Sequence, residues 1–410
     1  MRLKEICDYI SRGTTPDYVD KSPYKVMNQA TFSKGRLDED NIRYTSKNVR
    51  EAQIKKGDLL MASTGGGVLG KVFFFDSDDT SFYADSHVSI LRNSKGKNLM
   101  KYLYYVFSIK YDEINATMVK GSTNQTELQR NYLLAYEMDI PSLSKQQRIV
   151  DYLDAELGKI DARIAVLEKE QDAYARLKKS VIHHAVTRGL DPNVSLKDSG
   201  VEWIGMIPEH WETKRIKDVV SDIFTGVSPV YEYDNDNQNY VFGQRNNQEY
   251  GIDFEGIKYA KDDFFKTRLP KEFLKYGDVL LNTLGGGSVG RTGYYDIEDN
   301  ISVITDGHVM IVRSKTYNTR YMYYYLCSRK ERLEMMATGS TNQAFFNISD
   351  IRIVSLPMPS LGEQQTIASY LDDKCTRIDA TTENIGKQID ALKRLKRALI
   401  NEVVTGQRAV

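Results

Sequence analysis

The sequence predicts an α+β fold in which two globular domains of one type are each followed by a long helix. The first observation is that the chain repeats itself in order, at a period near half its length. Such a period is too long for a solenoid, whose units run roughly 20 to 50 residues. The second observation is that each copy passes from a part rich in strand and turn signals to a long stretch with helical periodicity.

The repeat is clearest around a glycine-rich segment. Residues 56–71 return as residues 276–291, with Gly-Asp at the start and three consecutive glycines in the middle of both. Further along, Gly121–Gln125 recurs unchanged as Gly339–Gln343. A chain of 410 residues has room for two such copies, each with an ordinary core.

The first part of each copy, residues 1–143 and 213–360, is rich in Tyr, Phe, Val, Gly and Asn. Short apolar runs lie between turn residues there, so strands and loops are expected to dominate. One helix is expected in each part, at 99–109 and at 319–333, because Tyr and Leu cluster there without Gly or Pro. Each first part is therefore predicted to be an α+β domain.

The second part of each copy predicts one long amphipathic helix, at 144–190 and at 361–410. Apolar residues recur at steps of three and four, which marks a narrow seam along which the two helices are expected to pack on each other. About 45 residues at about 1.5 Å each make a rod of about 65 Å, so the helix is expected to be a spacer, a dimeriser or a docking surface. The predicted seam consists of Ile149, Leu153, Leu157, Ile160, Ile164, Leu167, Leu177, Leu371, Ile378, Ile385, Ile389, Leu392, Leu395 and Leu399.

Residues 191–212 form the predicted linker between the two copies. Both tryptophans of the chain, Trp203 and Trp211, lie in it, so we expect it to be packed down rather than free. A proline and two glycines near these tryptophans argue against regular secondary structure.

The composition excludes several classes of protein. With 56 basic and 56 acidic residues the net charge is zero, which argues against a generic polyanion binder but leaves local patches open. No apolar run approaches 18 residues and the start of the chain is charged, so we expect no membrane span, no secretion signal and a cytoplasmic location. Cys7, Cys327 and Cys375 are odd in number and far apart, which predicts neither a disulfide framework nor a metal site.

The glycine-rich segment Gly65–Lys71 has the spacing of a phosphate-binding loop, but Val72 stands where that loop needs a hydroxyl. The second copy has Arg291 and then Thr292, so it lacks the lysine instead. A nucleotide-binding enzyme therefore stays only as an alternative function. A tight turn that brings one basic residue close to a nucleic-acid phosphate fits both copies, and so does a purely structural turn.

Two further polar loops have two interpretations each. The identical Gly-Ser-Thr-Asn-Gln loops could donate to phosphates or base edges, yet such residues also fix turns by bonding their own backbone. After an early strand the copies differ, with Asn-Gln-Ala-Thr at 28–31 facing Gln-Arg-Asn-Asn at 244–247. If both domains do one job on different targets, shared residues hold the fold and diverged polar residues read the difference. Drift in an exposed loop is the other interpretation.

An acidic residue and a histidine recur two positions apart, as Asp85 with His87 and Asp306 with His308. Such residues share a face of a strand, but no nucleophile or metal-ligand set accompanies them. We therefore expect both histidines to be structural.

Taken together, these segments resemble the DNA specificity subunits of type I restriction-modification systems over essentially the whole chain. The resemblance rests on Ser199–Glu212, on the Gly-Asp-Leu/Val-Leu strands at 57 and 277, and on the Pro-Ser-Leu, Gln-Gln, Ile and Tyr-Leu-Asp start of each helix. The first copy lacks the Ile-Pro-Glu-His-Trp lead of the second, and Met206 stands where an acidic residue is common.

The resemblance implies that 1–143 and 213–360 are target-recognition domains, and that the helices pair as an antiparallel coiled coil with pseudo-two-fold symmetry. It implies a bipartite, asymmetric site in double-stranded DNA, one half per domain, with the helices setting the spacing. The implied partners are two adenine-methyltransferase subunits, and restriction (translocase and nuclease) subunits in the full complex. A coiled-coil scaffold without DNA specificity is a further alternative.

On this basis we predict DNA contacts from the loops of both copies, because amides suit adenine and Arg suits guanine in the major groove. Lys71 and Arg291 are assigned to phosphates. The predicted DNA-binding residues are Asn28, Gln29, Thr31, Ser63, Thr64, Lys71, Ser122, Thr123, Asn124, Gln125, Gln244, Arg245, Asn246, Asn247, Asn282, Thr283, Arg291, Ser340, Thr341, Asn342 and Gln343.

The sequence predicts recognition and scaffolding rather than catalysis. The Asn/Asp-Pro-Pro-aromatic motif, with which adenine methyltransferases hold the target amine, does not occur in it. It also has no complete ATPase loop and no nuclease-like carboxylate cluster. We therefore predict no catalytic residue, no metal and no cofactor.

Overall fold

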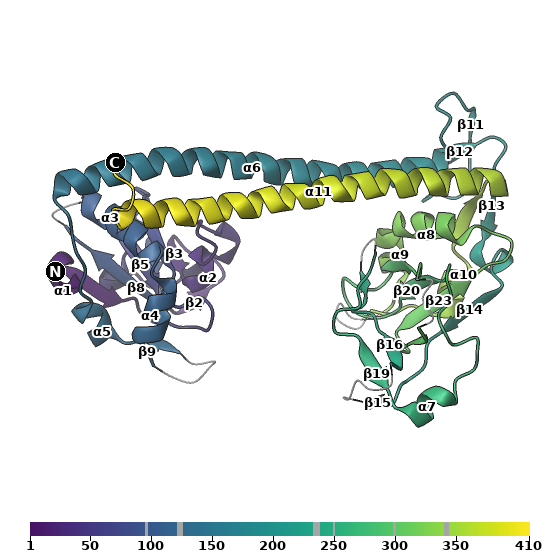
Figure 1. Ribbon diagram of the computed structural model, residues 1–410, viewed down its shortest axis with the longest axis horizontal. Coiled ribbons are helices and arrows are strands. Elements are labelled where there is room, and N and C mark those ends of the chain that lie inside the picture. Colours follow the sequence, from purple (N-terminus) through teal and green to yellow (C-terminus); the bar gives the residue numbers. More distant parts are fainter. Residues whose placement is uncertain (95–96, 121–125, 233–237, 249–250, 298–300, 340–343) are drawn as a thin grey trace. The chain divides into compact units, whose positions relative to one another are not determined.

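The computed structural model describes residues 1–94, 97–120, 126–232, 238–248, 251–297, 301–339 and 344–410. The chain divides into two units. Unit 1 consists of Met1–Glu168 and Gly386–Val410, and unit 2 consists of Lys169–Ile385. Each unit therefore contains one globular domain together with parts of both long helices (Figure 1).

The globular domain of unit 1 is built on two four-stranded sheets. The first sheet is antiparallel, with the order β1-β8-β5-β6, and the second has the order β2-β4-β3-β7, in which β3 and β7 are parallel. Val, Leu, Phe and Tyr predominate in these strands, as the pleated, half-buried surface favours. The strands are β1 (Tyr9–Arg12), β2 (Tyr18–Val19), β3 (Tyr24–Met27), β4 (Arg43–Thr45), β5 (Asp58–Ala62), β6 (Val72–Phe75), β7 (Phe82–Ala84) and β8 (Val88–Arg92).

Short helices complete this domain, and α3 packs on β5 and β6. The helix expected at 99–109 corresponds to α3. The helices are α1 (Leu3–Ile6), α2 (Gln29–Phe32), α3 (Lys97–Ser108), α4 (Tyr111–Thr117) and α5 (Arg130–Ala135), with 3-10 turns at Glu39–Asn41 and Arg50–Ala52. The strands β9 (Val119–Lys120) and β10 (Glu127–Leu128) pair as a two-stranded antiparallel ribbon.

The globular domain of unit 2 repeats this topology. Its sheets have the orders β14-β23-β20-β21 and β15-β19-β16-β22, and β16 and β22 are parallel like β3 and β7. The predicted α+β fold, made twice, is therefore confirmed. The strands are β14 (Asp222–Thr225), β15 (Tyr231–Glu232), β16 (Tyr240–Phe242), β17 (Asn247–Gln248), β18 (Gly251–Ile252), β19 (Lys258–Ala260), β20 (Val279–Asn282), β21 (Thr292–Tyr294), β22 (Val303–Thr305) and β23 (Val309–Arg313).

The helices of this second domain differ from the expectation at one point. The single helix expected at 319–333 is two helices, because the chain turns at Ser328 and Arg329. The helices are α7 (Asp262–Lys266), α8 (Thr319–Cys327), α9 (Lys330–Met336) and α10 (Ile348–Arg352), with a 3-10 turn at Ile216–Asp218.

Two long helices follow the globular domains: α6 (Leu143–Arg188) has 46 residues and α11 (Leu361–Val404) has 44. Within each unit they lie side by side and run in opposite directions (Figure 1). In unit 1, Leu153 and Leu157 of α6 share a core with Leu399 and Val403 of α11. In unit 2 the core contains Ile182, Ala185 and Val186 of α6 and Ile367, Leu371 and Cys375 of α11.

The predicted seam is wrong at two equivalent positions. Leu177 is 47% exposed and Leu395 is 53% exposed. A side chain three or four residues further along a helix keeps the same face only approximately, because the true period is 3.6 residues. The remaining predicted residues are buried, except Ile160, Ile164 and Leu392, which are half-buried.

Next to these leucines, the same ion pair is made in both units. In unit 2, Nζ of Lys178 lies 2.6 and 2.7 Å from the carboxylate oxygens of Asp379. In unit 1, Nζ of Lys396 lies 2.6 Å from both carboxylate oxygens of Asp161. Only the lysine of unit 2 is buried, with 7% of its side chain exposed against 30% for Lys396.

The linker is ordered, contrary to the expectation of irregular structure. It forms a hairpin of β11 (Leu196–Asp198) and β12 (Met206–Pro208). After it, β13 (Glu212–Arg215) pairs with β24 (Ser355–Met358). Gly200 and Gly205 lie in the segment that connects the two strands of the hairpin, and both have positive φ.

Trp211 holds this linker against the start of α11, as expected of a packed linker. It is 1% exposed, and its Nε1 donates to Oε1 of Glu363 over 3.2 Å. Nε2 of His210 lies 2.7 Å from the same oxygen. Burial raises the pKa of Glu363, but the hydrogen bonds from His210, Trp211 and Ser360 outweigh it and lower the pKa to about 2.

Candidate nucleic-acid interface

A glutamine follows the parallel strand pair in both units. Met27 of β3 pairs with Ala84, and Phe242 of β16 pairs with Thr305, so residues 27 and 242 are equivalent. Gln29 and Gln244 each stand two residues later and are therefore equivalent too. The sequence comparison aligns residues 28–31 with residues 244–247. The strand pairing shows that this alignment is wrong by one residue, because 28–31 are equivalent to 243–246. The glutamine is shared and its neighbours differ: Asn28 is equivalent to Gly243, Ala30 to Arg245 and Thr31 to Asn246.

The glycine-rich turn packs directly against this glutamine. It joins β5 to β6 in unit 1 and β20 to β21 in unit 2. Its first glycines, Gly65 and Gly285, have φ of 97° and 93°. A Cβ at Gly65 would lie 2.9 Å from Nε2 of Gln29, the end of a side chain that can shift, so it is the positive φ that requires glycine here.

A hydroxyl group of the same turn bonds the glutamine side chain. In unit 1, Oγ1 of Thr64 donates to Oε1 of Gln29 over 3.2 Å, and it also lies 2.7 Å from Nδ1 of His87. In unit 2, Oγ of Ser288 lies 3.1 Å from Oε1 of Gln244 and 2.6 Å from the backbone oxygen of Leu284, so these two acceptors share its one proton. Both glutamines are half-buried.

Seven of the predicted DNA-binding residues have side chains that form hydrogen bonds within their own domain and stabilise these loops. In unit 1, Asn28 caps α2 by accepting from the backbone amides of Ala30 and Thr31. In unit 2, Nδ2 of Asn247 donates to Oδ1 of Asn282 over 3.0 Å. The side chains of these residues bond within the domain, and six of them are buried: Thr31, Ser63, Asn246, Asn247, Asn282 and Thr283.

The basic residues that end the two turns are directed at the glutamine-bearing segment. Nζ of Lys71 donates to the backbone oxygen of Ser33 over 3.0 Å. Nη1 of Arg291 lies 3.3 Å from Oε1 of Gln248, and residue 248 is equivalent to Ser33 in the corrected register. Arg245, by contrast, is exposed beside its glutamine.

The repeated Gly-Ser-Thr-Asn-Gln motif lies largely outside the described residues. This applies to Ser122, Thr123, Asn124, Gln125, Ser340, Thr341, Asn342 and Gln343. The residues that follow the motif contact the glycine-rich turns. Gly65 N donates to the oxygen of Thr126 over 3.3 Å, and Gly285 N donates to the oxygen of Ala344 over 2.9 Å.

The two histidines that the sequence analysis assigns to a structural role lie at this site. His87 and His308 are exposed, and their backbone oxygens accept from Ser63 N and Thr283 N at the start of the glycine-rich turn. Burial raises the pKa of the neighbouring Asp85 carboxyl. The recurrence of the Asp–His pair beside the turn was visible in the sequence, but its position against the glutamine needed the sheet register.

A cation also lies over an exposed or half-buried tyrosine on the second sheet of each unit. Arg43 lies 5.2 Å from the ring centroid of Tyr18, and Lys258 lies 4.6 Å from that of Tyr231. Both cations are exposed. A cation on an aromatic face is suited to backbone phosphates or to stacking against a base.

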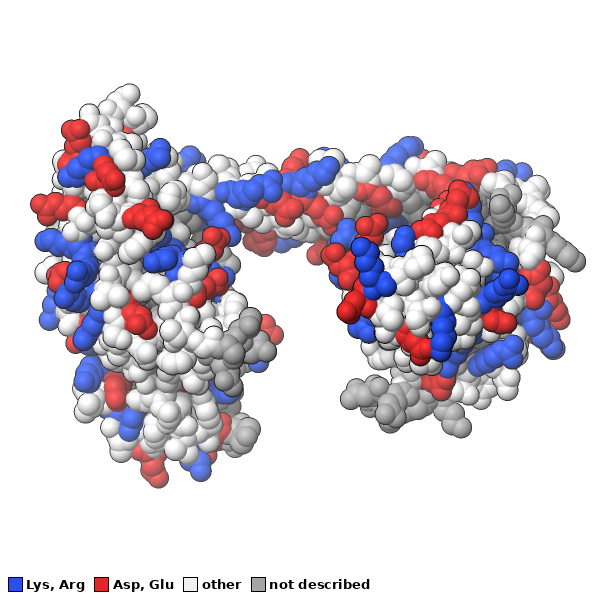
Figure 2. Space-filling view, turned by 180° about the vertical axis from the view of Figure 1, so that it is seen from behind, with Lys and Arg blue, Asp and Glu red and all other residues white. Residues whose placement is uncertain are grey.

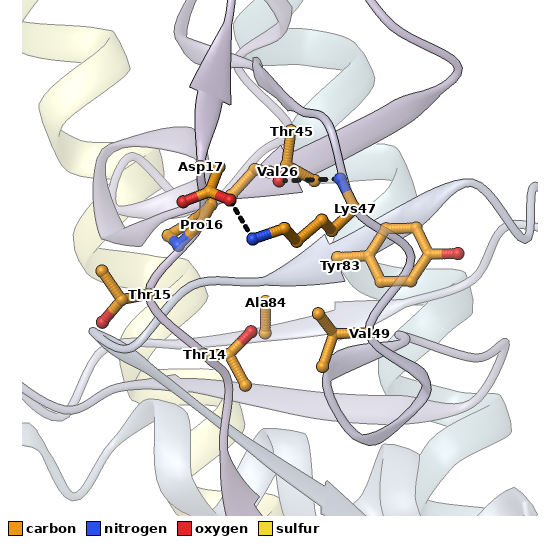
Figure 3. A pocket seen from close by; sticks show the side chains of 10 residues that line it. All are labelled: Thr14, Thr15, Pro16, Asp17, Val26, Thr45, Lys47, Val49, Tyr83 and Ala84. Carbon is orange, nitrogen blue, oxygen red and sulfur yellow. Dashed lines mark hydrogen bonds and ion pairs between the residues drawn. The ribbon is translucent and has the colours of Figure 1, made fainter.

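One pocket near these residues lies beside Tyr18 and Arg43, with a volume of about 340 Å³, and the Gly65–Lys71 turn does not line it. A second pocket, between Thr14, Lys47 and Tyr83, has a volume of about 70 Å³, and Lys47 and Asp17, which form an ion pair, both line it (Figure 3). The Gly65–Lys71 turn does not line it, and a strand follows that turn where a nucleotide-binding loop would have a helix.

The surface charge is mixed. On the face in Figure 2, basic and acidic side chains alternate over the helices and both domains. Among the described residues, no group of three or more His, Cys, Asp or Glu side chains is placed to hold a metal ion. None of the described helices combines the length and apolar character needed to cross a bilayer.

Comparison with known proteins places these features in one family. The model of the "Type I restriction modification DNA specificity domain" matches residues 1–169 and 208–394. The type I restriction enzyme MjaVIII specificity subunit of Methanocaldococcus jannaschii is 24% identical over 365 residues, which cover 87% of this chain and 80% of that protein. The MjaIX specificity subunit of the same organism is 22% identical, over 76% of this chain and 69% of that protein.

A solved structure has the same fold. It comes from work on complex assembly and conformational transition of the type I R-M system. It is 18% identical, with a TM-score of 0.70, and the match covers 98% of this chain and 96% of that one.

Proposed function

Because the chain belongs to the family of type I restriction-modification DNA specificity subunits, we propose that each of its two globular domains binds one half of a bipartite DNA sequence. The observation that supports this proposal most strongly is that the same arrangement of residues occurs in both units. In both units a glutamine, a glycine-rich turn with a terminal basic residue, and an exposed histidine come together. The residues around this common frame differ, as two different half-sites require.

The residues that we propose to contact bases are Gln29, Gln244 and Arg245, which are half-buried or exposed. Gln29 and Gln244 have the amide groups that suit adenine, and Arg245 has the guanidinium that suits guanine. The buried asparagines and threonines are assigned to holding the loops. Lys71 and Arg291 stay candidates for phosphate contacts, together with Arg43 and Lys258.

The long helices are proposed to set the spacing between half-sites and to bind methyltransferase subunits, with restriction subunits joining the full complex. Apolar side chains of α6 and α11 that stay exposed to solvent support the docking role. Leu177 and Leu395, at equivalent positions of α6 and α11, are about half exposed, and Val166 is 46% exposed. We propose that the chain itself contributes recognition and no catalysis.

The test is to express the chain with adenine-methyltransferase subunits of its system and to sequence the methylated sites. The expected result is one asymmetric, bipartite consensus. Arg245→Ala places in unit 2 the residue that unit 1 has at the equivalent position. It should relax one base of one half-site, at about 1–3 kcal/mol, and leave the other half unchanged. Methylation without a bipartite consensus would contradict the proposed function.

A matched variant tests the role of the helices. Deleting seven residues from α6 and the equivalent seven from α11 removes about 10 Å of helix, which is about three base pairs of B-DNA. The gap in the consensus should shorten, or methylation should stop. An unchanged gap would contradict the proposed role as a spacer.

A further inference from the structure

We propose that Thr64 and Ser288 are positioning residues that fix Gln29 and Gln244 in the conformation that reads DNA. The inference rests on the proposed function, because it specifies how the reading side chain is held. Each hydroxyl belongs to the glycine-rich turn and lies within hydrogen-bond distance of the glutamine Oε1 of its own unit, 3.2 Å away in unit 1 and 3.1 Å in unit 2, where the backbone oxygen of Leu284 is a second acceptor.

The two hydroxyls do not come from equivalent positions. Thr64 is equivalent to Leu284, and Ser288 is equivalent to Val68, because the turns align glycine for glycine. Each unit therefore has one hydroxyl and one aliphatic side chain at these two places, in the opposite order. A hydroxyl within reach of the glutamine is retained, although its position in the turn differs between the units.

The geometry of the turn shows why either position reaches the glutamine. A Cβ built on Gly65 would lie 3.3 Å from Cγ2 of Val68, and one built on Gly285 would lie 3.0 Å from Oγ of Ser288. The methyl group of Val68 therefore stands close to where unit 2 has its hydroxyl. A serine at 68 would be placed to bond Gln29.

This contact further restricts the rotation of a glutamine side chain that is half-buried. A glutamine loses up to about 2 kcal/mol of rotamer entropy when it is ordered. A hydroxyl that orders it before DNA arrives reduces that loss during binding, which is the advantage of preorganisation. In unit 1 the same hydroxyl contacts His87, so the test must separate the two partners.

The experiment compares variants of unit 1 in the complex with methyltransferase subunits. Thr64→Val removes the hydroxyl at nearly constant volume, and Thr64→Ser keeps it. The double variant Thr64→Leu with Val68→Ser moves the hydroxyl to the position used in unit 2 and removes the contact with His87. Each complex is assayed for binding to the wild-type site and to duplexes altered at each base, and for its methylated consensus.

Thr64→Val should weaken binding about tenfold, as expected for one hydrogen bond, and should relax only the half-site read by unit 1. Thr64→Ser and the double variant should restore both properties. The second half-site is an internal control, because a folding defect would affect the whole site. Thermal unfolding of each variant identifies a loss of folded protein directly.

Wild-type specificity in Thr64→Val would overturn the inference. So would a double variant that stays as defective as Thr64→Val, because Thr64 would then act through His87. These outcomes differ from failure of the proposed function itself, which is the absence of a bipartite consensus with the wild-type chain.

Discussion

Replacing Asp379 by Asn is expected to destabilise unit 2, because it removes the carboxylate that faces the buried ammonium of Lys178. That side chain is 7% exposed, and the carboxylate oxygens lie 2.6 and 2.7 Å from it. Removing one partner of a fully buried pair costs about 3–5 kcal/mol. Asp379 is 55% exposed, so solvent screens part of the interaction and we expect a cost of about 2–3 kcal/mol.

The equivalent ion pair of unit 1 is the matched control. Its lysine, Lys396, is 30% exposed, and its partner Asp161 is 53% exposed. Pairs in contact with water contribute about 0–1 kcal/mol, so Asp161→Asn should cost less than about 1 kcal/mol. Lys178→Met should also cost less than Asp379→Asn, because it replaces the buried charge by an apolar side chain and leaves a solvated carboxylate.

Urea unfolding followed by tryptophan fluorescence measures unit 2 selectively, because Trp203 and Trp211 both belong to it. The effect of Asp161→Asn is measured by hydrogen exchange of the α6 amides in unit 1. Equal losses in Asp379→Asn and Asp161→Asn would refute the reasoning from burial. A larger loss in Lys178→Met than in Asp379→Asn would refute it as well.

Three other outcomes are expected. The pKa of Glu363 is lowered from 4.5 to about 2 on folding, so its contribution is present above pH 4.5 and is lost as the pH falls towards 2. Glu363→Gln should therefore flatten the acid limb of a fluorescence-monitored stability curve in that window. An unchanged limb would contradict this. Gly70→Ala should lower stability to heat by about 1–3 kcal/mol, since φ is 86° and the new Cβ would lie 2.9 Å from Cγ2 of Ile114. A neutral variant would argue against that contact. Burial raises the pKa of Cys7 to about 12 and that of Cys375 to about 11, so iodoacetamide should label both slowly until the protein unfolds. Rapid labelling of the native protein, seen by mass spectrometry, would show that they are accessible.

The fold could be predicted from the sequence because its signals are long and repeated. Two copies in the same order require two similar domains, and a helical period sustained over more than forty residues is hard to mistake. The seam failed at Leu177 and Leu395, where spacing alone does not decide which of two adjacent side chains faces the partner helix. The buried position belongs to Lys178, whose polarity a pattern of apolar residues cannot reveal.

The candidate site could be predicted as a set of loops but not residue by residue. An asparagine that caps a helix and one that contacts a base use the same amide group, so Asn28 and Asn246 could not be sorted by type. Facing the copies at 28 and 244 also hid the shared glutamine. The correct register depends on the parallel pairing of β3 with β7 and of β16 with β22, which joins residues far apart in the chain.

The division of the chain has a consequence for its synthesis. Unit 2 is inserted within unit 1, whose core includes Leu399, Ile400 and Val403 near the C-terminus. A ribosome adds roughly 5 to 20 residues per second, and domains usually fold in order of emergence. In this chain, unit 1 is synthesised first, but its core is complete only after Leu399, Ile400 and Val403 have been added. Until then this core lacks the side chains that α11 contributes to it.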